Sequence, residues 1–204
     1  MHQANVSFFA NRKTQRMLFN YSKIRELSLF KKMNVRQLST SRETIPSTHA
    51  SPLFHSSLTD YRQYIESNHE INTLSFLDRP MRSKSIMRFF EKPFQWPNKL
   101  SALSFERCQI DDDGLLTLCS YITDAPKSML LLNLAGNDIT TTNIDAFAKA
   151  IAQTNIQIIH LEHNQINLLS LKAAMSEHVQ QKIILHTTDG KHIYLGNDSQ
   201  SLEI

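Results

Sequence analysis

Glycine, cysteine and long apolar runs are all scarce in this sequence of 204 residues. With only four glycines, the chain lacks the glycine-rich loop that phosphate-binding sites use. The two cysteines, Cys108 and Cys119, are too few for a disulfide framework, which indicates a reducing compartment and predicts a cytoplasmic location. No apolar run approaches the roughly 20 residues that a membrane-spanning helix needs, so we expect a soluble protein.

Recognisable catalytic motifs are missing as well. The sequence contains no nucleophile elbow and no paired-carboxylate constellation. The acidic run Asp111–Asp113 precedes Gly114 at the expected start of a helix, where the helix dipole favours acidic side chains without any calcium ion. We therefore predict that the chain is not an enzyme and takes no small-molecule substrate and no cofactor.

The segment HLEHN is the strongest metal-ligating pattern, because it holds His160, Glu162 and His163 close together. His186 and His192 follow in the next predicted element. His160 is expected on a strand and His163 at the exit of that strand, so that the two side chains face different ways. Neither H-E-x-x-H nor C-x-x-C occurs. The pattern predicts a polar surface cluster and no metal site.

Positive charge is concentrated at the N-terminal end. Residues 1–45 carry nine basic and two acidic side chains, whereas the remainder carries 13 and 17. A Ser/Thr/Pro-rich stretch without periodicity follows at 39–52, so residues 1–57 are predicted to be a basic arm with a linker. Three interpretations of the arm stay open: a mitochondrial presequence processed after Leu38, a segment that contacts acidic membrane lipid or nucleic acid, and a leader with no role of its own.

A pattern of eleven residues recurs along the chain, with starts at positions 71, 100, 129 and 156. Apolar residues occupy equivalent places in every copy, and cysteine or asparagine occupies the ninth place in three of them, as Cys108, Asn137 and Asn164. In the first copy Arg79 stands there, and a charged side chain is costly to bury. Further apolar residues after each copy are spaced i, i+3 and i+4, which is one face of a helix. Each unit therefore predicts a short strand, a turn and a helix.

The pattern L-x-x-L-x-L-x-x-N/C-x-L, with a helix in every copy, resembles the leucine-rich repeat of the ribonuclease-inhibitor-like type. The resemblance covers residues 71–182 and implies an α/β fold: a short solenoid of about four repeats with a parallel sheet on its concave side. The composition also resembles leucine-rich repeat effectors that intracellular bacteria deliver into host cells, which implies the host cytosol. The presequence interpretation of the arm implies instead an assembly or adaptor protein of the mitochondrial matrix.

Both ends of such an array need a cover for their apolar faces. Residues 58–70 are amphipathic and are predicted to form an N-terminal capping helix. Apolar residues alternate on both sides of Asp189-Gly190, which is a strong hairpin signal, so residues 183–204 are predicted to be a hairpin cap with a tail. Arg79 makes the first repeat irregular.

The resemblance also implies where a protein partner binds. Strand side chains that alternate with the buried ones face the concave side: Thr73, Ser75, Leu77, Ala102, Ser104, Glu106, Leu131, Asn133, Ala135, Ile158, His160 and Glu162. This array is polar in the middle, partly apolar on one flank and free of any basic stripe, which suits a protein partner better than nucleic acid. Cys108, Asn137 and Asn164 are expected to bond to backbone groups in the turn after the strand.

Overall fold

The computed structural model describes residues 49–50, 57–68, 70–91, 93–188 and 192–195. The chain divides into two compact units, Met1–Thr44 and Ile45–Ile204, and all described residues belong to the second. The basic arm, the turn at Asp189-Gly190 and the predicted tail lie outside the described residues.

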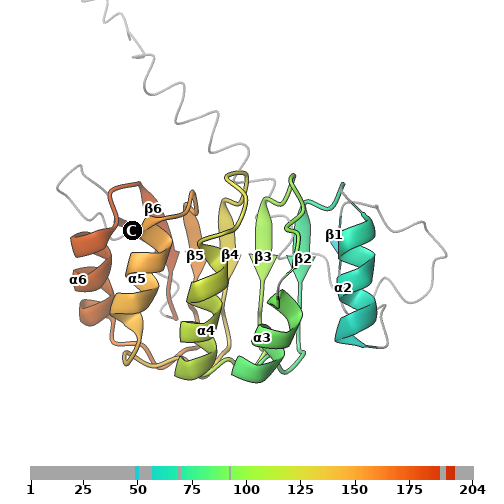
Figure 1. Cartoon of the computed structure of the whole chain (residues 1–204). Coiled ribbons are helices and arrows are strands. Elements are labelled where there is room, and N and C mark those ends of the chain that lie inside the picture. Colours follow the sequence, from blue (N-terminus) through green and yellow to red (C-terminus); the bar gives the residue numbers. More distant parts are fainter. Residues whose placement is uncertain (1–48, 51–56, 69, 92, 189–191, 196–204) are drawn as a thin grey trace, which may run out of the picture. The chain divides into compact units, whose positions relative to one another are not determined.

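A seven-stranded sheet runs through the second unit, with its strands in the order of the chain from β1 to β7 (Figure 1). Strands β1 to β6 are parallel, and β7 runs antiparallel to β6. The strands are β1 (His49–Ala50), β2 (Thr73–Ser75), β3 (Ala102–Ser104), β4 (Leu131–Asn133), β5 (Ile158–His160), β6 (Ile183–His186) and β7 (His192–Leu195).

A helix follows each strand from β2 to β5. These helices are α3 (Ser83–Phe90), α4 (Asp112–Ile122), α5 (Ile144–Ala152) and α6 (Leu168–His178). They pack side by side as one layer on one side of the sheet (Figure 1). Alternating strands and helices with a mostly parallel sheet make this an α/β repeat fold. None of the helices in the described part of the chain is long and apolar enough to cross a membrane.

Helix α2 (Leu58–Ser67) precedes β2 and is shorter than the helix predicted for residues 58–70. Ser57 caps its N-terminus by accepting a hydrogen bond from the Asp60 N–H at 3.1 Å. The helix ends at Ser67, and the next residue, Asn68, has an extended conformation with φ −124° and ψ 93°. Its buried side chains are Tyr61 and Ile65.

The core lies between the sheet and the helix layer. Each strand from β2 to β6 contributes a fully buried aliphatic side chain: Leu74, Leu103, Leu132, Ile159 and Leu185. The helices meet them with the residues that the i, i+3, i+4 spacing predicted, among them Phe89, Leu118 and Phe147. Burial of one such side chain contributes roughly 1.5–3 kcal/mol, so no single repeat is stable without its neighbours.

The β2 end of the core is aromatic. The Tyr61 ring of α2 lies 5.3 Å from Phe76 and 5.8 Å from Phe89, and Phe76 stacks on Phe105 at 4.7 Å. The Tyr61 hydroxyl donates to the Ser75 carbonyl at 3.2 Å, which satisfies it in an apolar setting. Tyr61 thus links α2 to the first of the strand–helix units.

Acidic residues 111–113 form the start of α4. The Asp111 carboxylate accepts a hydrogen bond from the Gly114 N–H at 2.8 Å and caps the helix. Asp112 accepts one from the Thr140 N–H, also at 2.8 Å, and so joins α4 to the turn of the following unit. Both of these carboxylates have structural partners at the place where the sequence predicts a helix N-terminus.

Candidate functional site

The sheet has one side that faces α3–α6 and an opposite side, called here the open face. Successive side chains of a strand point to opposite sides of the sheet. The residues on either side of the buried Leu74, Leu103, Leu132 and Ile159 therefore point to the open face. Strand register aligns them in rows. The first row holds Thr73, Ala102, Leu131 and Ile158, the middle row Ser75, Ser104, Asn133 and His160, and the third row Leu77, Glu106, Ala135 and Glu162.

Backbone hydrogen bonds continue the alignment into the third row, beyond the ends of the strands. The Arg107 N–H donates to the Ala135 carbonyl at 2.9 Å, and the Gly136 N–H donates to the Glu162 carbonyl at 2.8 Å. The residues predicted to contact a partner are therefore brought together on one surface.

Exposure is uneven along the first row. Ala102 and Ile158 are only 6% and 4% exposed, so they offer almost no area to a partner. Thr73 and Leu131 in the same row are half-buried, as are all four residues of the middle row. The accessible part of the predicted site is thus smaller than the twelve residues that the sequence indicates.

The rows extend further than the sequence analysis placed them. Ile184 pairs with Ile158 in the first row, and His186 pairs with His160 in the middle row. Across β6 and β7, Tyr194 pairs with Ile184 and His192 with His186. The apolar alternation on both sides of Asp189-Gly190 predicts these two strands. Strands that continue the sheet also continue its open face, so the same alternation could have extended the predicted rows.

The charged residues of the third row are acidic, and one of them, Glu106, belongs to an ion-pair network. Arg107 bonds to both carboxylate oxygens of Asp78 at 2.6 and 3.0 Å and to Glu106 at 2.8 Å. This guanidinium lowers the pKa of Asp78 below its ordinary value, mainly through the hydrogen bond. Asn133 donates to the other Glu106 oxygen at 3.3 Å. Asp78 and Arg107 were not among the predicted site residues, because the repeat pattern assigns no role to their positions.

The predicted turn residues bond to the backbone of their own unit and of the preceding one. The Asn137 side-chain amide donates to the carbonyls of Phe105 and Leu134 at 2.8 Å, and its oxygen accepts from the N–H groups of Cys108 and Ile110 at 3.0 Å. Asn164 donates to the Leu134 carbonyl at 2.8 Å. These side chains complete the hydrogen bonds of turn groups that have no strand partner.

Cys108 occupies the same place as a thiol that donates to the Phe76 carbonyl at 2.7 Å. Burial raises the pKa of Cys108 to about 12, and the same cause raises the pKa of Cys119 to about 12. Both thiols are therefore neutral at physiological pH, and neither is activated as a nucleophile.

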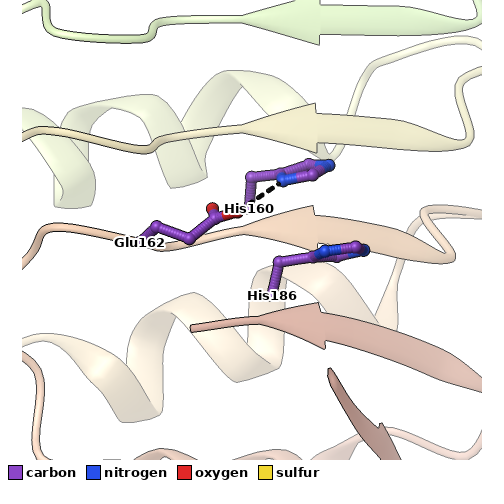
Figure 2. Close-up of side chains that lie close together, drawn as sticks. All are labelled: His160, Glu162 and His186. Atoms are coloured by element: carbon purple, nitrogen blue, oxygen red, sulfur yellow. Dashed lines mark hydrogen bonds and ion pairs between the residues drawn. The ribbon is translucent and has the colours of Figure 1, made fainter. Parts of the chain in front are cut away.

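Histidines gather at the β6 end of the open face (Figure 2). The His160 Nδ1 lies 3.1 Å from the Glu162 Oε1, and the His160 and His186 rings stack with centroids 4.1 Å apart. His192 packs edge-on against His186 at 4.4 Å. His163 lies in the turn after β5 with φ 58°, is exposed, and takes no part in these contacts. His160, Glu162, His186 and His192 therefore lie together, whereas His163 lies apart from them.

Residues 97–119 match the family model described as Leucine Rich repeat. The match supports a leucine-rich repeat family for this chain. It spans β3, the turn with Cys108 and most of α4, which is one strand–turn–helix unit of the repeat fold. No match was found among curated proteins. Leucine-rich repeats commonly mediate protein–protein interaction and are typically non-catalytic, and their exposed strand face is the usual binding surface.

Proposed function

We propose that this leucine-rich repeat chain is a non-catalytic module that binds a protein partner through the open face of its sheet. The observation that carries the proposal is the alignment of two rows of side chains across neighbouring strands, which a third row continues beyond the strand ends. Such an array presents many contacts at fixed spacing and needs no pocket. It is the kind of surface on which repeat proteins hold an extended partner.

The proposed array has four repeats of the ribonuclease-inhibitor-like type: β2–α3, β3–α4, β4–α5 and β5–α6. A left-handed residue follows each strand at the same place, as Asp78, Arg107, Gly136 and His163. These positions are 29, 29 and 27 residues apart, which is the spacing of the sequence repeat. Helix α2 is proposed as the N-terminal cap and the β6–β7 pair as the C-terminal cap.

The chemistry of the open face suggests the kind of partner. Leu77 and Leu131 offer apolar contact, the middle row offers hydrogen-bonding groups, and Glu106 and Glu162 bring carboxylates, of which Glu106 is paired with Arg107. A protein segment with apolar side chains and positively charged groups complements this surface. Acidic nucleic acid does not, because these rows contain no lysine or arginine.

Arginine substitutions on opposite sides of the fold test the proposal. Ser75→Arg with Ser104→Arg adds two bulky cations to the middle row, at side chains that α3–α6 do not cover. Met87→Arg with Leu116→Arg is the matched control, because both residues are exposed large apolar side chains on the helix layer. We expect the first pair to weaken the binding of proximity-labelled partners by about tenfold or more and the control pair to leave it unchanged. If both pairs recover the same partners with the same affinity, the open face is not the binding surface.

Two cellular settings fit this function. The compositional resemblance to bacterial effectors favours the host cytosol, and the basic character of residues 1–45 favours a mitochondrial adaptor with a cleaved presequence. Mass spectrometry of the functional protein distinguishes the two. A mature N-terminus at Ser39 supports the mitochondrial setting, and an intact Met1 contradicts it.

A further inference from the structure

The middle row of the open face ends in three histidines on neighbouring strands. Strand register pairs His160 on β5 with His186 on β6, and His186 with His192 on β7. Glu162 lies on the same face, two residues beyond His160. We propose that His160, Glu162 and His186 bind a divalent transition-metal ion of the zinc class.

Convergence of ligand atoms is the first argument. One ring nitrogen of each histidine and one carboxylate oxygen of Glu162 all lie within 4.8 Å of one another. Figure 2 shows the two rings side by side, with the Glu162 carboxylate reaching back toward His160. Zinc holds nitrogen and oxygen ligands at about 2.0–2.2 Å, so two of its ligands lie roughly 3.3 Å apart. Rotation of the imidazole rings about χ2, a soft torsion, brings the nitrogens to that separation.

The donor set is the second argument. Neutral imidazole and carboxylate together suit zinc, copper and nickel, whereas magnesium and calcium require oxygen ligands. The contact of 3.1 Å between His160 Nδ1 and Glu162 Oε1 already holds an imidazole nitrogen and a carboxylate oxygen close together. In the metal-bound state the neutral imidazole would offer the lone pair of one ring nitrogen, keep its proton on the other, and exchange this hydrogen bond for bonds from both side chains to the ion.

Burial is the third argument. The side chains of His160 and Glu162 are 17% and 14% exposed, so water competes weakly for the ion while the site stays open to solvent. His192 packs edge-on against His186, with ring centroids 4.4 Å apart. The Nδ1 of His192 is buried and has no hydrogen-bond partner in the described part of the chain, which is costly for a polar atom.

A second group of ligand-type residues on the molecule is less suitable. Asp145, Glu177 and His178 also bring their ligand atoms within 4.8 Å, but Asp145 and Glu177 are exposed. The Asp145 carboxylate already accepts from Lys149 at 2.6 Å and contacts His178 Nε2 at 2.7 Å. A lysine ammonium at that carboxylate repels a divalent cation. This group therefore supplies a control.

Calorimetric titration of the full chain with Zn²⁺ alone tests the site. We expect one strong binding event in the wild-type protein and an affinity loss of about tenfold or more in His186→Gln and in Glu162→Gln. His163→Gln and His178→Gln are the matched controls and should bind as the wild type does. Equal losses in His163→Gln and His186→Gln, or no loss in any variant, would show that the zinc binds elsewhere and would overturn the assignment.

A second measurement keeps the test independent of variant folding. Zn²⁺ should raise the melting temperature of the wild type and of His163→Gln, and leave that of His186→Gln unchanged. In the wild-type protein, Co²⁺ should broaden the imidazole NMR signals of His160 and His186 before those of His163 and His178. Broadening of all four signals at the same metal concentration contradicts the site.

Discussion

At the scale of single residues, Asn137 connects two units of the repeat fold more directly than any apolar side chain does. It is the one buried polar residue in the described part of the chain, with 4% exposure. Its amide bonds to Phe105 in the unit before it, and its oxygen accepts from Cys108 and Ile110 in that same unit. Two turns therefore depend on a single side chain.

Asn137→Ala should lower the free energy of unfolding by about 1–3 kcal/mol, because backbone N–H groups of Cys108 and Ile110 lose their acceptor in a buried setting. Asn164→Ala is the comparison, because Asn164 is half-buried and accepts from the Ile139 N–H at the longer distance of 3.2 Å. Urea denaturation should place the midpoint of Asn137→Ala below that of Asn164→Ala. The reverse order would mean that burial does not determine how much stability is lost when these hydrogen bonds are removed.

Sequence alone could indicate Asn137 because its place recurs at a fixed offset in each copy. The same periodicity could not indicate the pairing of His160 with His186, since His186 lies on β6, outside the four copies. Its partner depends on how β6 continues the sheet, which is a register decided by tertiary packing. The low exposure of Ala102 and Ile158 likewise depends on packing, and alternation along a strand cannot reveal it.

At the scale of elements, the turn after each strand from β2 to β5 has a residue in the left-handed region at the same place, and the turn after β3 has a second one, Gln109, with φ 55°. Asp78, Arg107, Gly136 and His163 have φ values of 56°, 55°, 68° and 58°. Only Gly136 adopts such a conformation freely, and the other three pay a steric cost of about 1–2 kcal/mol. Because three of the four are not glycine, composition gave no sign of this turn. The strand and the helix on either side were predictable from their apolar spacing.

Gly136→Ala should destabilise the fold for two separate reasons. The new side chain must accept φ +68°, and its Cβ would lie 2.8 Å from the Arg107 Cγ. We expect a loss of about 1–2 kcal/mol for the first reason, with an added cost for the second. Repeating the substitution in an Arg107→Ala background removes the Cγ and isolates the conformational part. If the loss is the same in both backgrounds, the contact with Arg107 contributes nothing.

At the scale of the whole described unit, the two ends of the sheet differ in chemistry. Beside β2 the rings of Tyr61, Phe76 and Phe89 pack against one another, whereas the β6 end has histidines on its open face and β7 along its edge. In a repeat fold each unit contacts only its neighbours, so the stability of the ends decides how far unfolding can spread inward. Tyr61 is the natural probe of the α2 end because it is fully buried and titratable.

Burial raises the pKa of Tyr61 above its ordinary value of 10.0. The neutral phenol is therefore favoured in the folded state, and its contribution to stability is present below pH 10 and lost as the pH rises further. Tyr61→Phe removes the ionisation along with the hydrogen bond to Ser75, so it should be less stable than the wild type by about 1 kcal/mol at pH 8. That difference should shrink or reverse between pH 10 and 11, at up to about 1.4 kcal/mol per pH unit. The two proteins differ only at residue 61, so the difference between their stabilities reports on that residue. The measurement is the urea midpoint of each protein across pH 8–11. A difference in stability that stays constant over this range would mean that Tyr61 is accessible to water and that α2 does not seal this end of the core.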